Sequence, residues 1–106
     1  MAGKVKDLTD STFDTAVSAG VTLVDFWAPW CPPCRAQGPI VEKLAGDFDG
    51  KALVAKVNVD EEAQAATKYG VASIPTLVIL KDGKEVKRFV GLRQEDELVE
   101  ALNSLI

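Results

Sequence analysis

The residues best suited to chemistry in this sequence are its only two cysteines, Cys31 and Cys34, which lie three positions apart. They stand where an apolar stretch ends and a long helix is predicted to begin. The first sulfur then falls near the helix N-terminus, where unpaired backbone N–H groups and the helix dipole favour a thiolate. We therefore expect Cys31 to be the exposed nucleophile that attacks a disulfide of a partner molecule. Cys34, one turn inside the helix, would attack the resulting mixed disulfide and release the reduced partner.

Two other uses of a Cys-x-x-Cys pair remain as alternatives. A zinc site needs four ligands, and the chain offers no second cysteine pair and no histidine, so only a metal shared between chains would fit. A purely structural disulfide between such near neighbours removes little entropy from the unfolded chain, and cytosolic reductants would open it. The spacing therefore favours redox chemistry.

Proton transfer must use a group other than imidazole, because the absence of histidine excludes Ser-His triads, Cys-His nucleophiles and imidazole metal ligands. Asp25 lies within a strand otherwise made of Leu, Val, Phe and Trp, so we expect its carboxyl group to be buried at a desolvation cost. Burial should raise its pKa. An Asp that points outward from an edge strand is the alternative.

The elements that position these residues can be predicted in order along the first half of the chain. Residues 22–27 are apolar on both faces, which is typical of a buried central strand. A helix should run from Pro33 to about residue 50, kinked by Pro39 within it. A weak strand at residues 4–8 should come first. A short helix should follow, capped by Asp10 and Ser11, with Phe13 and Val17 on its buried face, and Gly20 should end it.

The second half predicts a strand at residues 53–59 and a helix that ends near residue 70, with residues 60–62 as its acidic first turn. Strands at residues 76–80 and 86–90 flank an Asp-Gly pair, which indicates a hairpin. Leu98, Ala101, Leu102 and Leu105 mark an amphipathic last helix. This order predicts a mixed sheet with helices on both faces, in one domain over residues 1–106.

Five separated stretches carry a family resemblance, in matching order and spacing: residues 24–34, 55–60, 69–71, 74–76 and 82–83. Over essentially the whole chain the sequence resembles the thioredoxin family. The resemblance implies an α/β thioredoxin fold, with a central mixed five-stranded β-sheet flanked by four α-helices. It also implies dithiol-disulfide exchange with protein substrates through Cys31 and Cys34 as the redox-active pair.

The same resemblance implies roles for residues around the cysteines. Asp25 would lie behind Cys34 and help to move its proton, and the ammonium group of Lys56 would approach Asp25 and moderate its pKa. A surface lysine that extends its ammonium into solvent is the alternative for Lys56. The Ile74–Pro75 bond would be cis and would face the disulfide.

An apolar rim around Cys31 would then dock an extended peptide, with ordinary packing as the alternative for Val71 and Val90. Its expected members are Trp30, Pro33, Val71, Ala72, Ile74, Pro75, Val90 and Gly91. One departure from the family is the Pro32-Pro33 pair, where Gly-Pro is usual. Pro32 removes a backbone N–H near the Cys31 sulfur and stiffens the loop, so both prolines should tune the redox potential, in a direction that the sequence leaves open.

Composition limits the partners. Twelve Lys and Arg residues against sixteen Asp and Glu give a formal net charge of -4, so no basic surface for nucleic acid is expected. The start of the chain has no apolar signal-peptide core, and residues 21–30, interrupted by Asp25, are too short to span a bilayer. We therefore expect a cytoplasmic monomer without membrane or nucleic-acid partners.

The leading functional hypothesis is a general protein-disulfide reductase. The chain has no Rossmann fingerprint and no flavin site, so no bound cofactor is expected and a separate thioredoxin reductase would supply the electrons. A disulfide oxidant or isomerase on the same fold is one alternative. A redox-independent binding module that uses the same apolar rim is the other.

Overall fold

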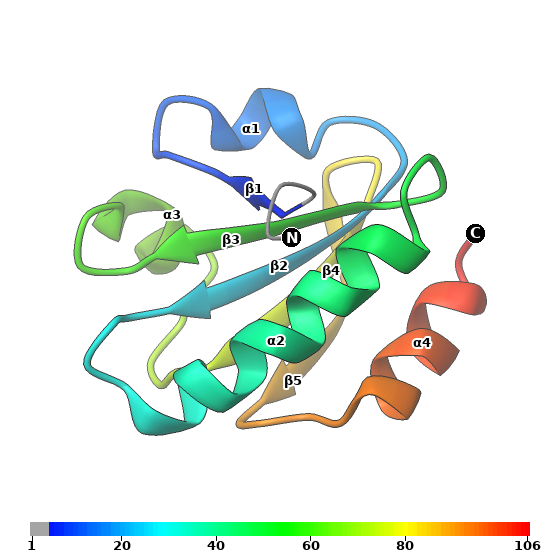
Figure 1. Cartoon of the computed structure of the whole chain (residues 1–106). Helices are drawn as coiled ribbons and strands as arrows, with labels where there is room; N and C mark the ends of the chain where they lie inside the picture. The colour runs from blue at the N-terminus through cyan, green and yellow to red at the C-terminus, as the bar shows by residue number, and fades with distance from the viewer. Residues whose placement is uncertain (1–4) are drawn as a thin grey trace.

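A mixed β-sheet with helices on both faces forms the centre of the computed structural model, which describes residues 5–106 (Figure 1). Within these residues there are five strands and four helices, as predicted. The strands are β1 (Lys6–Asp7), β2 (Val21–Trp27), β3 (Leu53–Asn58), β4 (Thr76–Lys81) and β5 (Lys84–Val90). The helices are α1 (Phe13–Ala16), α2 (Pro32–Asp47), α3 (Ala63–Lys68) and α4 (Glu95–Asn103). Lys4, the first residue of the predicted N-terminal strand, lies outside the described residues.

Strand β2 is the centre of the sheet, whose order is β1-β3-β2-β4-β5. It pairs in parallel with β3 and antiparallel with β4, so that Asp25 lies beside Lys56 on one side and Leu77 on the other. Because parallel strands end at the same edge, the segments that follow β2 and β3 lie next to each other. The two cysteines follow β2 at that edge.

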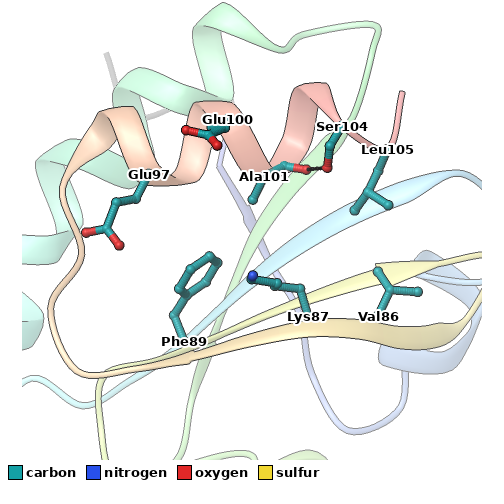
Figure 2. A pocket seen from close by; sticks show the side chains of 8 residues that line it. All are labelled: Val86, Lys87, Phe89, Glu97, Glu100, Ala101, Ser104 and Leu105. Carbon is teal, nitrogen blue, oxygen red and sulfur yellow. Dashed lines mark hydrogen bonds between the residues drawn. The ribbon is translucent and has the colours of Figure 1, made fainter.

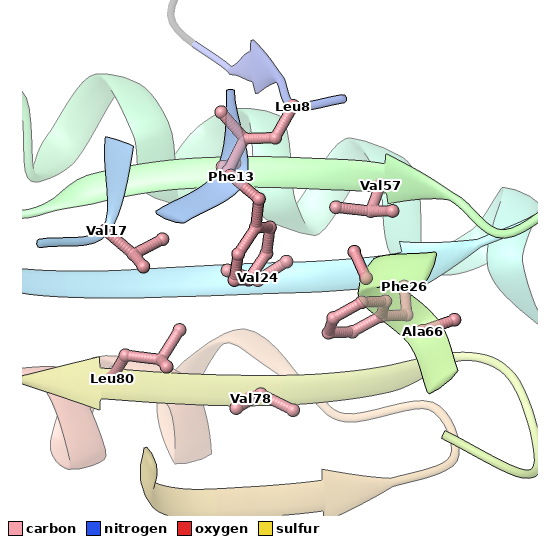
Figure 3. Packing of buried hydrophobic residues seen from close by; sticks show 11 residues of the cluster. Leu8, Phe13, Val17, Val24, Phe26, Val57, Ala66, Val78 and Leu80 are labelled. Carbon is pink, nitrogen blue, oxygen red and sulfur yellow. The ribbon is translucent and has the colours of Figure 1, made fainter. Parts of the chain in front are cut away.

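The two faces of the sheet have separate cores, and Figure 3 shows the one under α1 and α3. Under α1 and α3, Val24, Phe26, Val57, Val78 and Leu80 form a cluster with Leu8, Phe13, Val17, Ala55, Ala65 and Ala66. The rings of Phe13, Phe26 and Tyr69 lie 5.3–6.4 Å apart there. Under α2 and α4 the cluster contains Val21, Leu23, Val41, Leu44, Ala45, Phe48, Val54, Leu77, Ile79, Leu98 and Leu102. The sheet is therefore covered on both sides, as a buried central strand requires.

The hairpin between β4 and β5 forms where the Asp-Gly pair predicted it. Asp82 has φ 51° and Gly83 has φ 85°, the left-handed conformations that a two-residue hairpin turn requires. A register shift near Ile79 adds one residue to β5. As a result Glu85 and Arg88 meet in a two-bond ion pair, and Arg88 also donates to the Tyr69 carbonyl oxygen.

Two predictions about helix starts are wrong. Thr12 is the N-cap residue of α1, and the Asp10 carboxylate instead accepts hydrogen bonds from the backbone N–H groups of Gln64 and Ala65, at the start of α3. The acidic residues 60–62 precede α3 and do not form its first turn. The tertiary fold brings Asp10 to α3, so an acid more than 50 residues away supplies the favourable charge at this helix start.

Candidate active site

The two cysteines lie at the N-terminus of α2, where their environments differ. Cys31 is the N-cap residue, and Pro32 and Pro33 occupy the first helical positions, where a backbone N–H is dispensable. The pair is disulfide-bonded, with Cα atoms 5.2 Å apart. The Cys34 backbone N–H donates to Cys31 Sγ over 3.3 Å. The same N–H would stabilise a thiolate on Cys31, whereas Cys34 Sγ lies one turn inside the helix.

The expected exposure of Cys31 is not found in the bridged form. Both cysteines are only 3% exposed, and they pack in a small cluster with Ala28 against the partly buried Trp27 and Ile74. Cys31 Sγ lies 3.8 Å from the Ile74 carbonyl oxygen. The loop that contains Ile74 covers the sulfur. The residues next to Cys31 in the sequence do not indicate that this distant loop will cover it.

The loop before β4 reaches the cysteines through a cis peptide bond. The Ile74–Pro75 bond is cis, as the family resemblance implied. The Pro75 carbonyl oxygen accepts a hydrogen bond of 2.8 Å from the backbone N–H of Gly91, directly after β5. Segments that are far apart in the sequence thus meet beside the disulfide.

Asp25 is buried, as its apolar neighbours predicted. Burial raises its pKa to about 7, and the nearby Lys56 charge lowers it by a smaller amount. Its Oδ1 atom has no hydrogen-bond partner among the described residues. Asp25 lies two positions after Leu23 on β2 and pairs with Leu77 on β4, so its side chain is on the same face as theirs. Leu23 and Leu77 belong to the core under α2 and α4, and the Asp25 carboxyl group therefore faces the side of the sheet that α2 covers.

Lys56 combines the two predicted arrangements. It is the β3 neighbour of Asp25, and its charge acts on that carboxyl group. Its ammonium group lies 3.7 Å from Asp7 and 5.0 Å from the centre of the Trp27 ring, at a half-exposed position. Lys56 therefore acts on Asp25 from the surface, through its charge rather than through a contact ion pair.

The residues predicted to form the rim lie in three segments of the chain and differ in exposure. Trp30 is 64% exposed and Val90 52% exposed, while Pro33 and Ala72 are exposed as well. Ile74 and Gly91 are half-buried and Pro75 is buried beside the disulfide. Val71 is half-buried and packs against the core under α1 and α3, so part of its side chain belongs to that core rather than to the rim.

Two polar anchors and one rim residue were missed by sequence reasoning. Trp30 Nε1 donates to the Asp60 carboxylate over 2.8 Å, which ties the segments after β2 and β3. Gln37 is 0% exposed and is paired with the backbone of Arg93. Leu92, 39% exposed, extends the rim beyond Gly91. A signal for Gln37 existed, because it is the polar member of the buried helical stripe Cys34, Gln37, Val41 and Leu44.

Other features of the described residues lie apart from this site. A hollow of about 430 Å³ between β5 and α4 is lined by Val86, Lys87, Phe89, Glu97, Glu100, Ala101, Ser104 and Leu105 (Figure 2). Neither cysteine lines it. Within residues 5–106, no set of three or more His, Cys, Asp or Glu side chains is arranged to hold a metal ion. None of the helices in that range has the length and apolar character to cross a membrane.

Comparison with known proteins gives a consistent result. The family model described as Thioredoxin matches residues 4–104. A thioredoxin of Staphylococcus epidermidis is 51% identical over 96 residues, which cover 91% of this chain and 92% of the relative. Thioredoxins of Staphylococcus haemolyticus and Staphylococcus aureus are 50% and 49% identical, with the same coverage.

Proposed function

Because the chain belongs to the thioredoxin family, we propose that its active site divides the work between an attacking sulfur, Cys31, and a resolving sulfur, Cys34. The chain is a protein-disulfide reductase with Cys31 and Cys34 as its redox pair. It carries no cofactor and is reduced by a thioredoxin reductase, and its other partners are substrate proteins. The proposal covers one domain, residues 1–106.

In the first step, the Cys31 thiolate attacks one sulfur of a substrate disulfide. A bond forms between Cys31 Sγ and that sulfur, the substrate disulfide breaks, and the departing substrate thiolate takes up a proton. The hydrogen bond from the Cys34 backbone N–H to Cys31 Sγ carries this assignment. It reaches the N-cap sulfur, where the helix dipole also favours negative charge.

In the second step, Cys34 loses its proton and attacks Cys31 Sγ. The Cys31–Cys34 bond forms, the mixed disulfide breaks, and the substrate leaves as a dithiol. We assign Asp25 as the group that accepts the Cys34 proton, because its pKa of about 7 allows it to gain and lose a proton near neutrality. Lys56 adjusts that pKa through its charge.

Substrate would lie as an extended segment on the rim formed by Trp30, Pro33, Val71, Ala72, Ile74, Pro75, Val90 and Gly91. Exposed apolar side chains at Trp30 and Val90 support this docking surface. Pro32 and Pro33, at the first two positions of α2, would tune the potential of the pair. We further propose that the protein acts as a cytoplasmic monomer, without nucleic-acid or membrane partners, which its net charge of -4 supports.

The test is to trap the mixed disulfide. The reduced Cys34→Ser variant, mixed with a disulfide-containing protein such as insulin, should accumulate a covalent adduct visible on a non-reducing gel, because the resolving sulfur is absent. The matched Cys31→Ser variant should accumulate little. Equal accumulation in both variants would show that the roles of the two sulfurs are assigned wrongly.

A further inference from the structure

We propose that Gln37 is a positioning residue for substrate binding, because it fixes the loop after β5 so that Leu92 offers a further apolar contact to protein substrates. The inference rests on the proposed function and deepens it. It concerns a side chain that takes no part in the sulfur chemistry and that is fully buried.

Both ends of the Gln37 amide are used on one residue of that loop. Gln37 Oε1 accepts from the Arg93 backbone N–H over 2.8 Å, and Gln37 Nε2 donates to the Arg93 carbonyl oxygen over 3.1 Å. The two residues are 56 positions apart in the sequence. The amide thus pairs with Arg93 much as a neighbouring strand would, and it fixes both the place and the orientation of the loop.

An amide is a costly choice for this position. Gln37 lies on the buried stripe of α2, where its helical neighbours are Cys34 and Val41. Burying an amide costs free energy unless it is hydrogen-bonded, and this amide offsets the cost only through its two bonds to the Arg93 backbone. What the amide adds is the defined geometry of residues 91–93.

A second anchor holds the other end of the same loop. The Gly91 backbone N–H donates to the Pro75 carbonyl oxygen over 2.8 Å, and Gly91 has φ 94°, a conformation that favours glycine. Leu92 lies between this bond and the Gln37–Arg93 pair, and its side chain is 39% exposed. An apolar group held at both ends is preorganised, so the loop loses less conformational freedom when substrate binds to it.

The Arg93 side chain supports the loop from outside. Its guanidinium donates to the Val90 carbonyl oxygen over 3.1 Å, lies 3.6 Å from Glu97, and stacks 5.5 Å from the centre of the Phe89 ring. Contacts of the Arg93 side chain and the two hydrogen bonds from Gln37 to the Arg93 backbone therefore act together on the position of Leu92.

The experiment compares a protein disulfide with a small one in single-turnover reactions of the reduced chain. Gln37→Leu keeps the apolar stripe filled but releases Arg93. We expect the half-saturating concentration of insulin to rise about fivefold, the loss of roughly 1 kcal/mol of binding, with the limiting rate within about twofold of the parent. Reduction of 5,5′-dithiobis(2-nitrobenzoate), which needs only the sulfurs, should keep its rate.

The control is Thr22→Val. It also replaces a buried polar side chain by an apolar one, at the end of β2 that is far from the cysteines. It should leave the reduction of both substrates unchanged. Leu92→Ser, a change at a partly exposed site that does not threaten folding, should raise the half-saturating concentration of insulin by a similar factor. Combined with Gln37→Leu it should add little, because both variants remove the same contact.

Three results would overturn the inference: an equal slowing of insulin and the small disulfide in Gln37→Leu, no effect of Leu92→Ser on insulin, or full additivity of the two changes. Each is distinct from a failure of the proposed sulfur roles, which the trapping of Cys34→Ser and Cys31→Ser tests without reference to the loop.

Discussion

The two faces of the central sheet are built differently. Under α1 and α3 the buried side chains are aromatic and aliphatic, apart from the uncharged Thr22 and Thr76. Under α2 and α4 an equally apolar cluster gives way, at the end next to the cysteines, to Asp25 and Gln37. Among residues 5–106, Asp25 is the one buried acidic or basic side chain.

The difference shows how the sheet separates stability from chemistry. The face under α1 and α3 can be packed for stability alone, because no reacting group lies on it. The face under α2 holds a carboxyl group that opposes folding when it is charged, yet an ionisable group beside the sulfurs is what proton transfer requires. One strand, β2, serves both faces because its side chains alternate.

The largest expected effect is a loss of stability from a substitution in the core under α1 and α3. Phe26→Ala should lower the free energy of unfolding by about 3–5 kcal/mol, because a fully buried ring in contact with Phe13 and Tyr69 is lost. Urea denaturation of the oxidised protein at several pH values measures it. The loss should be the same from pH 5 to pH 8. A loss that varied strongly with pH would mean that the two faces are coupled.

The next largest effect comes from Asp25→Asn, which removes the free-energy cost of a buried carboxylate on the face under α2. The folded-state pKa of Asp25, about 7, lies above the unfolded value of 3.8, so its carboxyl group contributes a penalty that grows as pH rises through this window and is complete above it. Relative to the parent, oxidised Asp25→Asn should gain stability as pH rises from about 4 to about 8, by up to about 4 kcal/mol. A stability difference independent of pH would show that Asp25 titrates normally.

Asp25→Asn should also differ from Phe26→Ala in the rate at which substrate is released from the mixed disulfide. Without an acceptor for the Cys34 proton, Asp25→Asn should release substrate from the mixed disulfide more slowly near pH 7, while Phe26→Ala, if folded, should release it at the parent rate. Rapid-quench measurement of the mixed disulfide over time distinguishes the two variants. Parental release in Asp25→Asn across pH would leave Asp25 with no part in proton transfer.

The smallest effect concerns Lys56. Its charge lowers the pKa of Asp25, so Lys56→Met should raise that pKa from its value of about 7. The Lys56 ammonium is half-exposed, and solvent screening limits the change to about 1 kcal/mol or less. Carbon-detected NMR titration of the Asp25 carboxyl group measures it. A lower pKa in the variant would mean that Lys56 acts on Asp25 by some means other than its charge.

The sequence alone was sufficient for features whose signals are local. The alternation of strands and helices follows from periodicity, the β4–β5 turn from Asp82 and Gly83, and the burial of Asp25 from its apolar neighbours along one strand. The position of the cysteines at a helix start also follows from short-range pattern. In each case the residues that carry the signal are the residues that form the structure.

Tertiary structure decided the contacts that join distant segments. Asp10 caps α3 rather than α1, Trp30 donates to Asp60, and Gln37 pairs with Arg93, over separations of 30 to 56 residues. The cover over Cys31 likewise comes from a loop that begins some 40 positions later. A polar side chain gives no sign in the sequence of which distant backbone will meet it, because that choice is made only when sheet order and helix packing bring the two together.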